Sequence, residues 1–68
     1  MEMIDVESSN LDSIGYDEPT REMNIAFNDG SLYAYYNVPP DIWNGFQNAS
    51  SAGQYFHQNI KGKYEHYR

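Results

Sequence analysis

The sequence predicts a small α+β domain: an antiparallel β-meander of three or four strands, followed by two short helices packed on one sheet face. In the first forty residues, apolar and polar side chains alternate, which is typical of half-buried strands. A Pro-Pro pair then follows an aromatic stretch, and apolar residues afterwards recur every three or four positions, which is typical of helices. With 68 residues, the chain has room for one domain, residues 1–68.

The expected strands differ in strength. Ile4 and Val6 alternate with acidic neighbours, as in a half-buried edge strand. The second strand is weaker and carries Gly15 as a candidate bulge. A polar Asp-Glu-Pro-Thr turn separates it from the third strand. In chain order the expected strands are residues 3–8, residues 11–16, residues 23–27 and an aromatic strand that starts at Ser31.

The turn between the third and fourth strands, Asn-Asp-Gly-Ser, decides which way the tyrosines face. A two-residue turn would leave Tyr33 and Tyr35 on the outer side of the sheet as an aromatic platform. A three-residue loop with a bulge would instead place Ile25 opposite Tyr33 and Met23 opposite Tyr35, in the core. A slip of one residue exchanges the two faces. The core arrangement is favoured, because Tyr opposite an aliphatic residue is ordinary sheet packing.

Two helices are expected after the strands. Pro39 and Pro40 suit a helix start, where the missing donor of proline costs nothing. The first helix carries an apolar stripe and is weakened by about 1 kcal/mol at Gly45. Ser51 and Gln54 have the spacing of a capping box for a second helix. That helix ends or loosens near Gly62, and residues 63–68 form a basic, aromatic tail.

Size and composition bear on partners and cofactors. A core this small is marginal, and the chain has no cysteines for disulfides. With His57 and His66 as its only histidines, we predict no metal site and no cofactor. Eleven aromatic residues offer packing material instead, so we predict a homo-oligomer. There is neither a basic start with an apolar run nor an apolar span of membrane length, so we expect a soluble, cytoplasmic protein.

The net charge is −6 and is unevenly distributed. Residues 1–41 contain nine acidic residues and one basic residue, whereas residues 42–68 contain one acidic and three basic residues. The overall charge argues against a broad electrostatic grip on nucleic acid. An anion-binding site is therefore expected in the C-terminal third of the chain.

A set of short motifs resembles the KTSC domain family. They are Ser8-Ser9, Ile14-Gly15-Tyr16, Gly30 with Tyr33-Ala34-Tyr35, Val38-Pro39, Ser51-Ala52-Gly53, Tyr55-Phe56, and Ile60 with Tyr64. Two positions depart from the family pattern: His57 stands where Asn is expected, and Lys61 where Arg is usual. The family occurs at the C-terminus of some lysyl-tRNA synthetases and as a stand-alone protein in bacteria and phages. The resemblance thus implies a role in RNA binding, which has been proposed for the family.

Each candidate binding residue also has a structural interpretation. The hydroxyls of Ser8 and Ser9 suit an anion but also suit local backbone groups. The amides at Ser51 and Gly53, with a nearby Lys61, would suit a phosphate, or Ser51 is simply a helix cap. His57 is either a base or a solvated helix residue. The candidate ligand-binding residues are Ser8, Ser9, Tyr16, Tyr33, Tyr35, Ser51, Gly53, His57, Lys61, Tyr64 and Arg68.

The C-terminal tail offers aromatic rings and a cation, Tyr64, His66, Tyr67 and Arg68, that could stack on a base and hold its phosphate. A frayed terminus explains the same residues. Catalysis finds little support, because Ser51 and His57 are not neighbours on a helix face. We therefore predict a non-enzymatic binding module. Its best-supported ligand is a nucleotide or another phosphate-bearing small molecule, sequestered by an oligomer if the protein is phage-encoded. RNA binding and a protein-protein adaptor are the alternatives.

Overall fold

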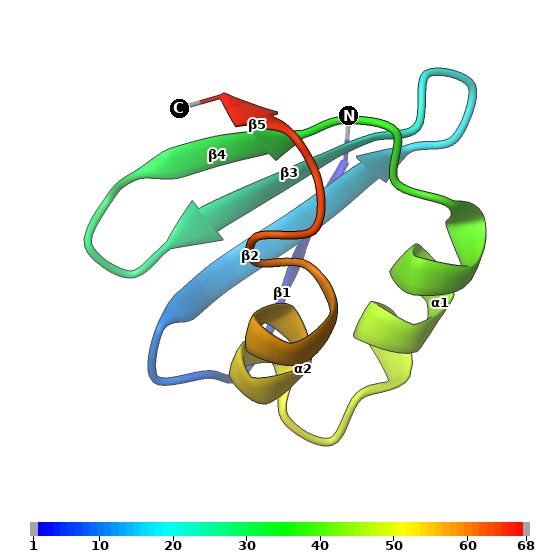
Figure 1. The fold of residues 1–68 in the computed structure, drawn as a ribbon. Coiled ribbons are helices and arrows are strands. Elements are labelled where there is room, and N and C mark those ends of the chain that lie inside the picture. Colours follow the sequence, from blue (N-terminus) through cyan, green and yellow to red (C-terminus); the bar gives the residue numbers. More distant parts are fainter. Residues whose placement is uncertain (1, 68) are drawn as a thin grey trace.

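In the computed structural model, which describes residues 2–67, five strands form one sheet and two helices cover one of its faces (Figure 1). The strands lie in the order β1-β2-β3-β4-β5, and all neighbouring pairs are antiparallel. Both helices fall between β4 and β5 in the chain. The elements are β1 Met3–Asp5, β2 Leu11–Asp17, β3 Glu22–Phe27, β4 Leu32–Tyr35, α1 Pro40–Asn48, α2 Ala52–Asn59 and β5 His66–Tyr67.

The α+β class and the meander predicted from the sequence are confirmed, with one strand more than expected. Strand β5 was missed, because two residues are too few to show a period. Strand β1 lies at the sheet edge, as predicted, but it ends at Asp5 and not at Ser8, and its three residues are exposed and not half-buried. The bulge expected at Gly15 was also wrong: the register shifts between Leu11 and Ser13, while Gly15 pairs regularly with Met3 and Asn24.

The β3–β4 hairpin has the three-residue loop. The amide of Phe27 donates to the carbonyl of Ser31 at 2.9 Å, and Gly30 closes the loop with a φ of +92°. Glycine tolerates this left-handed conformation at no steric cost. Ile25 therefore pairs with Tyr33 and Met23 with Tyr35, as the core arrangement required.

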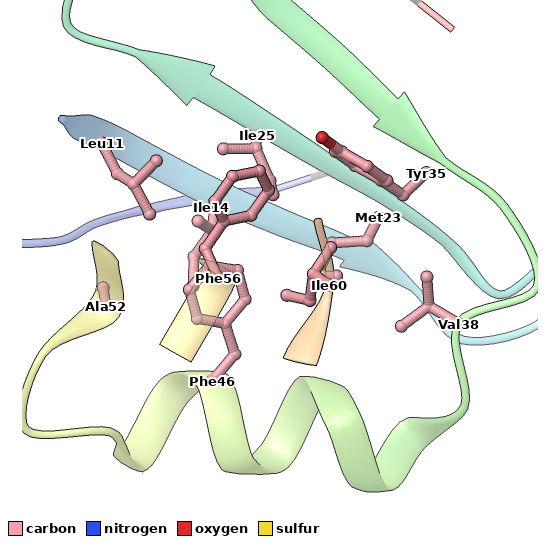
Figure 2. Packing of buried hydrophobic residues seen from close by; sticks show 10 residues of the cluster. All are labelled: Leu11, Ile14, Met23, Ile25, Tyr35, Val38, Phe46, Ala52, Phe56 and Ile60. Carbon is pink, nitrogen blue, oxygen red and sulfur yellow. The ribbon is translucent and has the colours of Figure 1, made fainter. Parts of the chain in front are cut away.

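The core lies between the sheet and the helices (Figure 2). Figure 2 shows Phe46 pointing from α1 toward Phe56 of α2 and toward Ile14 on the sheet. Tyr35 is only 3% exposed, so most of its ring belongs to this core. The ten buried hydrophobic residues of the core are Leu11, Ile14, Met23, Ile25, Tyr35, Val38, Phe46, Ala52, Phe56 and Ile60.

The helix ends match the sequence signals. Helix α1 begins at Pro40. The hydroxyl of Ser51 caps α2 by accepting a hydrogen bond from the amide of Gln54 at 3.3 Å. Helix α2 stops at Asn59, and Gly62 follows with a φ of +76°, which lets the chain turn back toward the sheet.

Gly45 is the point where α1 and α2 approach each other. The ring of Tyr55 stacks on Phe46, with 5.4 Å between the ring centroids, and its hydroxyl donates to the carbonyl of Ile42 at 3.1 Å. A Cβ atom at position 45 would meet the hydroxyl of Tyr55 and would lie 2.9 Å from its Cζ atom. The glycine that weakens α1 locally is therefore required by the packing of Tyr55.

We expect Gly45→Ala to lower the free energy of unfolding by about 1–3 kcal/mol, because the overpacking outweighs the gain in helix propensity. Urea unfolding measures the change. Tyr55→Phe removes the oxygen that is closest to the added methyl group, so the loss in the double variant should be smaller than the sum of the two single losses. A stabilised Gly45→Ala variant would contradict this packing.

Candidate ligand-binding site

A cavity of about 300 Å³ lies between the end of the sheet formed by β3, β4 and β5 and the segment that leads from α2 to β5. Figure 1 shows this segment crossing the same sheet face that the helices cover. The walls are mainly aromatic, and polar groups come from the β3–β4 loop and from the end of α2. The lining residues are Phe27, Asp29, Ser31, Tyr33, Tyr35, Phe56, Lys61, Gly62 and His66.

The aromatic walls are held together by ring contacts. Tyr33 and Tyr35 alternate along β4 on the helix-covered face and stack with 6.3 Å between their centroids. Phe56 of α2 meets Tyr35 edge-on at 5.9 Å and Phe27 at 5.5 Å. Phe27 in turn meets Tyr33 edge-on at 5.3 Å. Offset and edge-on pairs of this kind are favourable beyond the area they bury, so the cavity has a formed aromatic wall.

Strand β5 closes one side of the cavity. His66 pairs with Tyr35 in the sheet, and its ring centroid lies 5.6 Å from that of Tyr33 and 5.4 Å from that of Tyr35. Within residues 2–67, β5 pairs with Ala34 and Tyr35 of β4 and not with Leu32 or Tyr33. His66, for which the sequence left open either stacking on a base or a frayed terminus, therefore lies in a strand that lines the cavity.

Besides the aromatic residues, Asp29, Ser31 and Lys61 contribute polar side chains to the lining. In the β3–β4 loop, the Asp29 carboxylate accepts from the amide of Ser31 at 2.9 Å and from its hydroxyl at 2.6 Å. Lys61 is exposed and follows the end of α2. Among the residues that the structure describes, it is the only Lys or Arg in the lining of this cavity. An aromatic wall beside one ammonium group suits a planar ring that carries a negative charge.

The Tyr35 hydroxyl keeps its proton at neutral pH. Burial raises the pKa of Tyr35 above its usual value, and the neighbouring Tyr33 raises this pKa further. A protonated phenol both donates and accepts hydrogen bonds. Tyr35 therefore contributes a neutral polar atom to the cavity wall.

Tyr16 lies on another part of the structure. Its hydroxyl donates to the carbonyl of Val38 at 2.6 Å, and its ring stacks on Trp43 with 5.4 Å between centroids. Burial raises the pKa of Tyr16, and Arg21 opposes that rise. These contacts fasten the chain between β4 and α1 to the sheet and give Tyr16 a structural role.

Ser8 and Gly53 touch each other, away from the cavity. The Ser8 hydroxyl oxygen accepts from the amides of Asn10 and Leu11 at 3.2 and 3.3 Å, so it satisfies local backbone groups. A Cβ atom at position 53 would lie 3.1 Å from this oxygen, which explains the glycine. Ser9 is exposed and lines a separate, more open hollow. The structure therefore supports the backbone interpretation for Ser8 and gives Gly53 a structural role in close packing against Ser8.

Ser51 and Lys61 do not form the joint phosphate site that the sequence suggested. Ser51 is the N-cap of α2, whereas Lys61 lies two residues beyond its C-terminal end. An eight-residue helix is about 12 Å long, so the α2 amides and the Lys61 side chain start from opposite ends. The helix expected between Ser51 and Gly62 already implied this separation.

The remaining predicted residues scatter. His57 is exposed, with its ring edge-on to Phe56 at 5.5 Å. Tyr64 is half-buried against the core and helps to raise the pKa of Tyr55, for which burial is the larger cause. Tyr67 is 71% exposed. Arg68 lies outside the described residues.

Of the predicted residues, the cavity brings together Tyr33, Tyr35 and Lys61. Sequence reasoning assigned Phe56 to the core and gave no site role to the loop residues Asp29 and Ser31. Side chains alternate along β3, so Phe27 lies on the same face as Ile25. The place of Phe27 in the cavity wall can therefore be predicted once the strand register is known.

Among residues 2–67, no helix is long and apolar enough to cross a membrane. Within the same residues, no group of three or more His, Cys, Asp or Glu side chains is placed to hold a metal ion.

The family model of the KTSC domain matches residues 7–64, and the chain belongs to this family. A crystal structure of a KTSC domain protein from Yersinia pestis superimposes with a TM-score of 0.96 at 36% sequence identity. The match covers 98% of this chain and 94% of that chain. The family and the fold expected from the sequence motifs are thus confirmed.

Relatives of the chain are of two sizes. A lysine–tRNA ligase of Nostoc punctiforme is 39% identical over 59 residues, which is 87% of this chain but 10% of the ligase. A protein of Stutzerimonas stutzeri is 37% identical over 68 residues, which is all of this chain and 93% of that protein. The chain therefore spans about a tenth of the length of the ligase, and nearly the whole length of the smaller relative.

Stability should fall as the pH rises above about 10. The folded state raises the pKa values of Tyr16, Tyr35 and Tyr55 above 10.0, so it holds phenol protons that the unfolded chain releases first. The contribution of these tyrosines to the free energy of unfolding is fully present at a pH below their pKa in the unfolded chain. It is lost as the pH rises through their pKa in the folded protein. Thermal unfolding at pH values from about 8 to 11 measures this loss.

Tyr35→Phe should make the alkaline decline shallower, because the phenylalanine has no proton to lose. Tyr67→Phe is the matched control at an exposed position and should leave the decline unchanged. The same alkaline decline in wild type and Tyr35→Phe would show that the Tyr35 hydroxyl does not contribute to it.

Proposed function

We propose that this protein is a non-enzymatic binding module whose ligand is a nucleotide or another phosphate-bearing small molecule with a planar ring. The observation that carries the proposal is the cavity beside β4 and β5, which combines aromatic walls with the ammonium group of Lys61. The ligand ring would lie against Tyr33, Tyr35 and His66. Its phosphate would be held by Lys61.

Size and charge support a small ligand. The cavity, at about 300 Å³, is at the lower end of the usual range for small-molecule pockets, which begins near ~300 Å³. The charge of Lys61 is compact, and such a point charge is a common way to bind phosphate. The net charge of −6 disfavours long polyanions, which are bound through many phosphate contacts.

We further propose that the protein works as a homo-oligomer, so that each cavity lies near a junction between copies. The cavity borders the Leu32 end of β4, which no described residue of β5 pairs with, and Leu32 is 53% exposed. An extended strand edge of this kind can pair with another chain. A second copy seated there would shield the open side of the cavity.

RNA binding is the second candidate function. The observation that favours it is the similarity of the chain to a segment of lysine–tRNA ligases. Salt distinguishes the two candidates: RNA binding weakens steeply as salt rises, because many counterions are released, whereas binding of a small ligand weakens little.

Native mass spectrometry tests the ligand and the oligomer together. The protein is measured with a panel of linear and cyclic nucleotides and with a short single-stranded RNA. We expect a discrete oligomer that carries a fixed number of small nucleotides per subunit. A monomer that binds nothing in the panel would contradict both parts of the proposal.

Lys61→Ala should weaken nucleotide binding by roughly 10-fold or more, the effect expected when a charged hydrogen bond is lost. The thermal stability should hardly change, because Lys61 is exposed. Lys63→Ala is the matched control, since it removes the same charge from a neighbouring exposed residue outside the cavity lining. Equal losses in the two variants would place the phosphate elsewhere.

A further inference from the structure

The sheet face that points away from α1 and α2 is called the outer face here. Its members follow from the strand register, since residues next to them in sequence, such as Ile14, Ile25 and Tyr35, are buried on the other side. One row of the outer face crosses all five strands. In order across the sheet, this row is Met3, Gly15, Asn24, Ala34 and Tyr67.

On the outer face a strip of small side chains lies between larger ones, and this strip is called the trough. The neighbouring row consists of Asp5, Ser13, Ala26 and Leu32. Small side chains therefore form the floor over β2, β3 and part of β4. Large apolar side chains stand at the sides: Met3 on β1 and Leu32 and Tyr67 on β4 and β5, all three exposed.

The width of the trough suits one α-helix. Met3 and Tyr67 are separated by four strand spacings, which is about 19 Å between their backbones. An α-helix with its side chains is about 10–12 Å across. A helix laid over Gly15 and Ala34 would therefore contact the small floor and still reach the apolar side chains at both sides.

The charge of the outer face is entirely negative. Strands β1 to β5, as the structure describes them, contain four acidic residues and neither Lys nor Arg. Alternation along the strands places Asp5, Asp17 and Glu22 on the outer face, and Asp17 pairs with Glu22. A second copy packed face to face would bring these carboxylates together, and a nucleic acid would be repelled. A basic partner would be attracted.

The floor also contains a polar atom that lacks a partner. Asn24 lies at the centre of the floor, and its Oδ1 atom is buried without a hydrogen-bond partner among the described residues. Buried amide oxygens are nearly always paired. A donor on an incoming side chain would satisfy this acceptor after a small rotation of the amide.

We propose that the outer face is a docking surface for a basic amphipathic helix of another protein. The apolar side of that helix would pack on the floor formed by Gly15, Ala26 and Ala34. Its Lys or Arg side chains would pair with Asp5, Asp17 and Glu22. This surface is separate from the cavity, so a docked partner and a bound small molecule would occupy opposite faces of the same sheet.

A synthetic 18-residue helical peptide of Leu and Lys, labelled with fluorescein, is the probe for this proposal, and fluorescence anisotropy measures its binding. Ala34→Trp fills the trough and should abolish binding. Ala34→Leu introduces a smaller side chain, which a strand tolerates, and should weaken the binding of the peptide. Thermal unfolding of both variants shows whether they remain folded. A folded Ala34→Trp variant with unchanged affinity would overturn the proposal.

Charge variants separate docking from general attraction between a basic peptide and an acidic protein. Glu22→Gln should weaken binding by up to about fivefold, the range for a partly exposed ion pair. Asp41→Asn on α1 removes the same charge from the helix side and should change nothing. Three results would overturn the proposal. The first is an equal effect of Glu22→Gln and Asp41→Asn on the affinity for the peptide, and the second is binding of a peptide of Leu and Glu. The third is a dimer that the wild-type protein forms and the Ala34→Trp variant does not form.

Discussion

The register of the β3–β4 hairpin decides which side chains face the helices, and both the core and the cavity follow from it. Because the loop has three residues and Gly30 takes a positive φ, Tyr33 and Tyr35 lie on the face that the helices cover. A slip of one residue would turn both rings to the outer face. The core would then lose Tyr35, Phe56 would lose a ring partner, and the aromatic wall of the cavity would not form.

The same register gives the sheet two faces of different chemistry. The covered face carries the aromatic cavity, with Lys61 at the end of α2. The outer face carries small residues, exposed apolar side chains and carboxylates such as Glu22. The proposed small anion and the proposed basic partner would thus occupy different faces. This division accounts for an acidic chain in which three of the four basic residues follow residue 41.

Features with local signals could be predicted from the sequence. Alternation indicated β2 and β3, the Pro-Pro pair indicated the start of α1, and Ser51 indicated the cap of α2. Features that depend on tertiary contacts could not. Strand β5 forms only because β4 offers an edge, so the sequence left open whether His66 stacks on a base or belongs to a frayed terminus.

The candidate site was partly predictable for the same reason. Tyr33, Tyr35 and Lys61 were named from the sequence, but Lys61 was grouped with Ser51, which lies at the other end of α2. The role of Gly45 could not be predicted from the sequence either. Its low helix propensity weakens α1, and only its contact with Tyr55 explains why a glycine occupies this position.

We propose that a phosphate-bearing ligand binds in the aromatic cavity and not at the N-terminus of α2. A titration of the ¹⁵N-labelled protein with a mixture of the four ribonucleoside monophosphates, followed by amide chemical shifts, tests it most directly. We expect saturable changes in amide chemical shift that are centred on Tyr33, Tyr35, Lys61 and His66. The amide shifts of Ser51 and Gln54 should stay unchanged. Shifts centred on Ser51 and Gln54, or none at all, would contradict it.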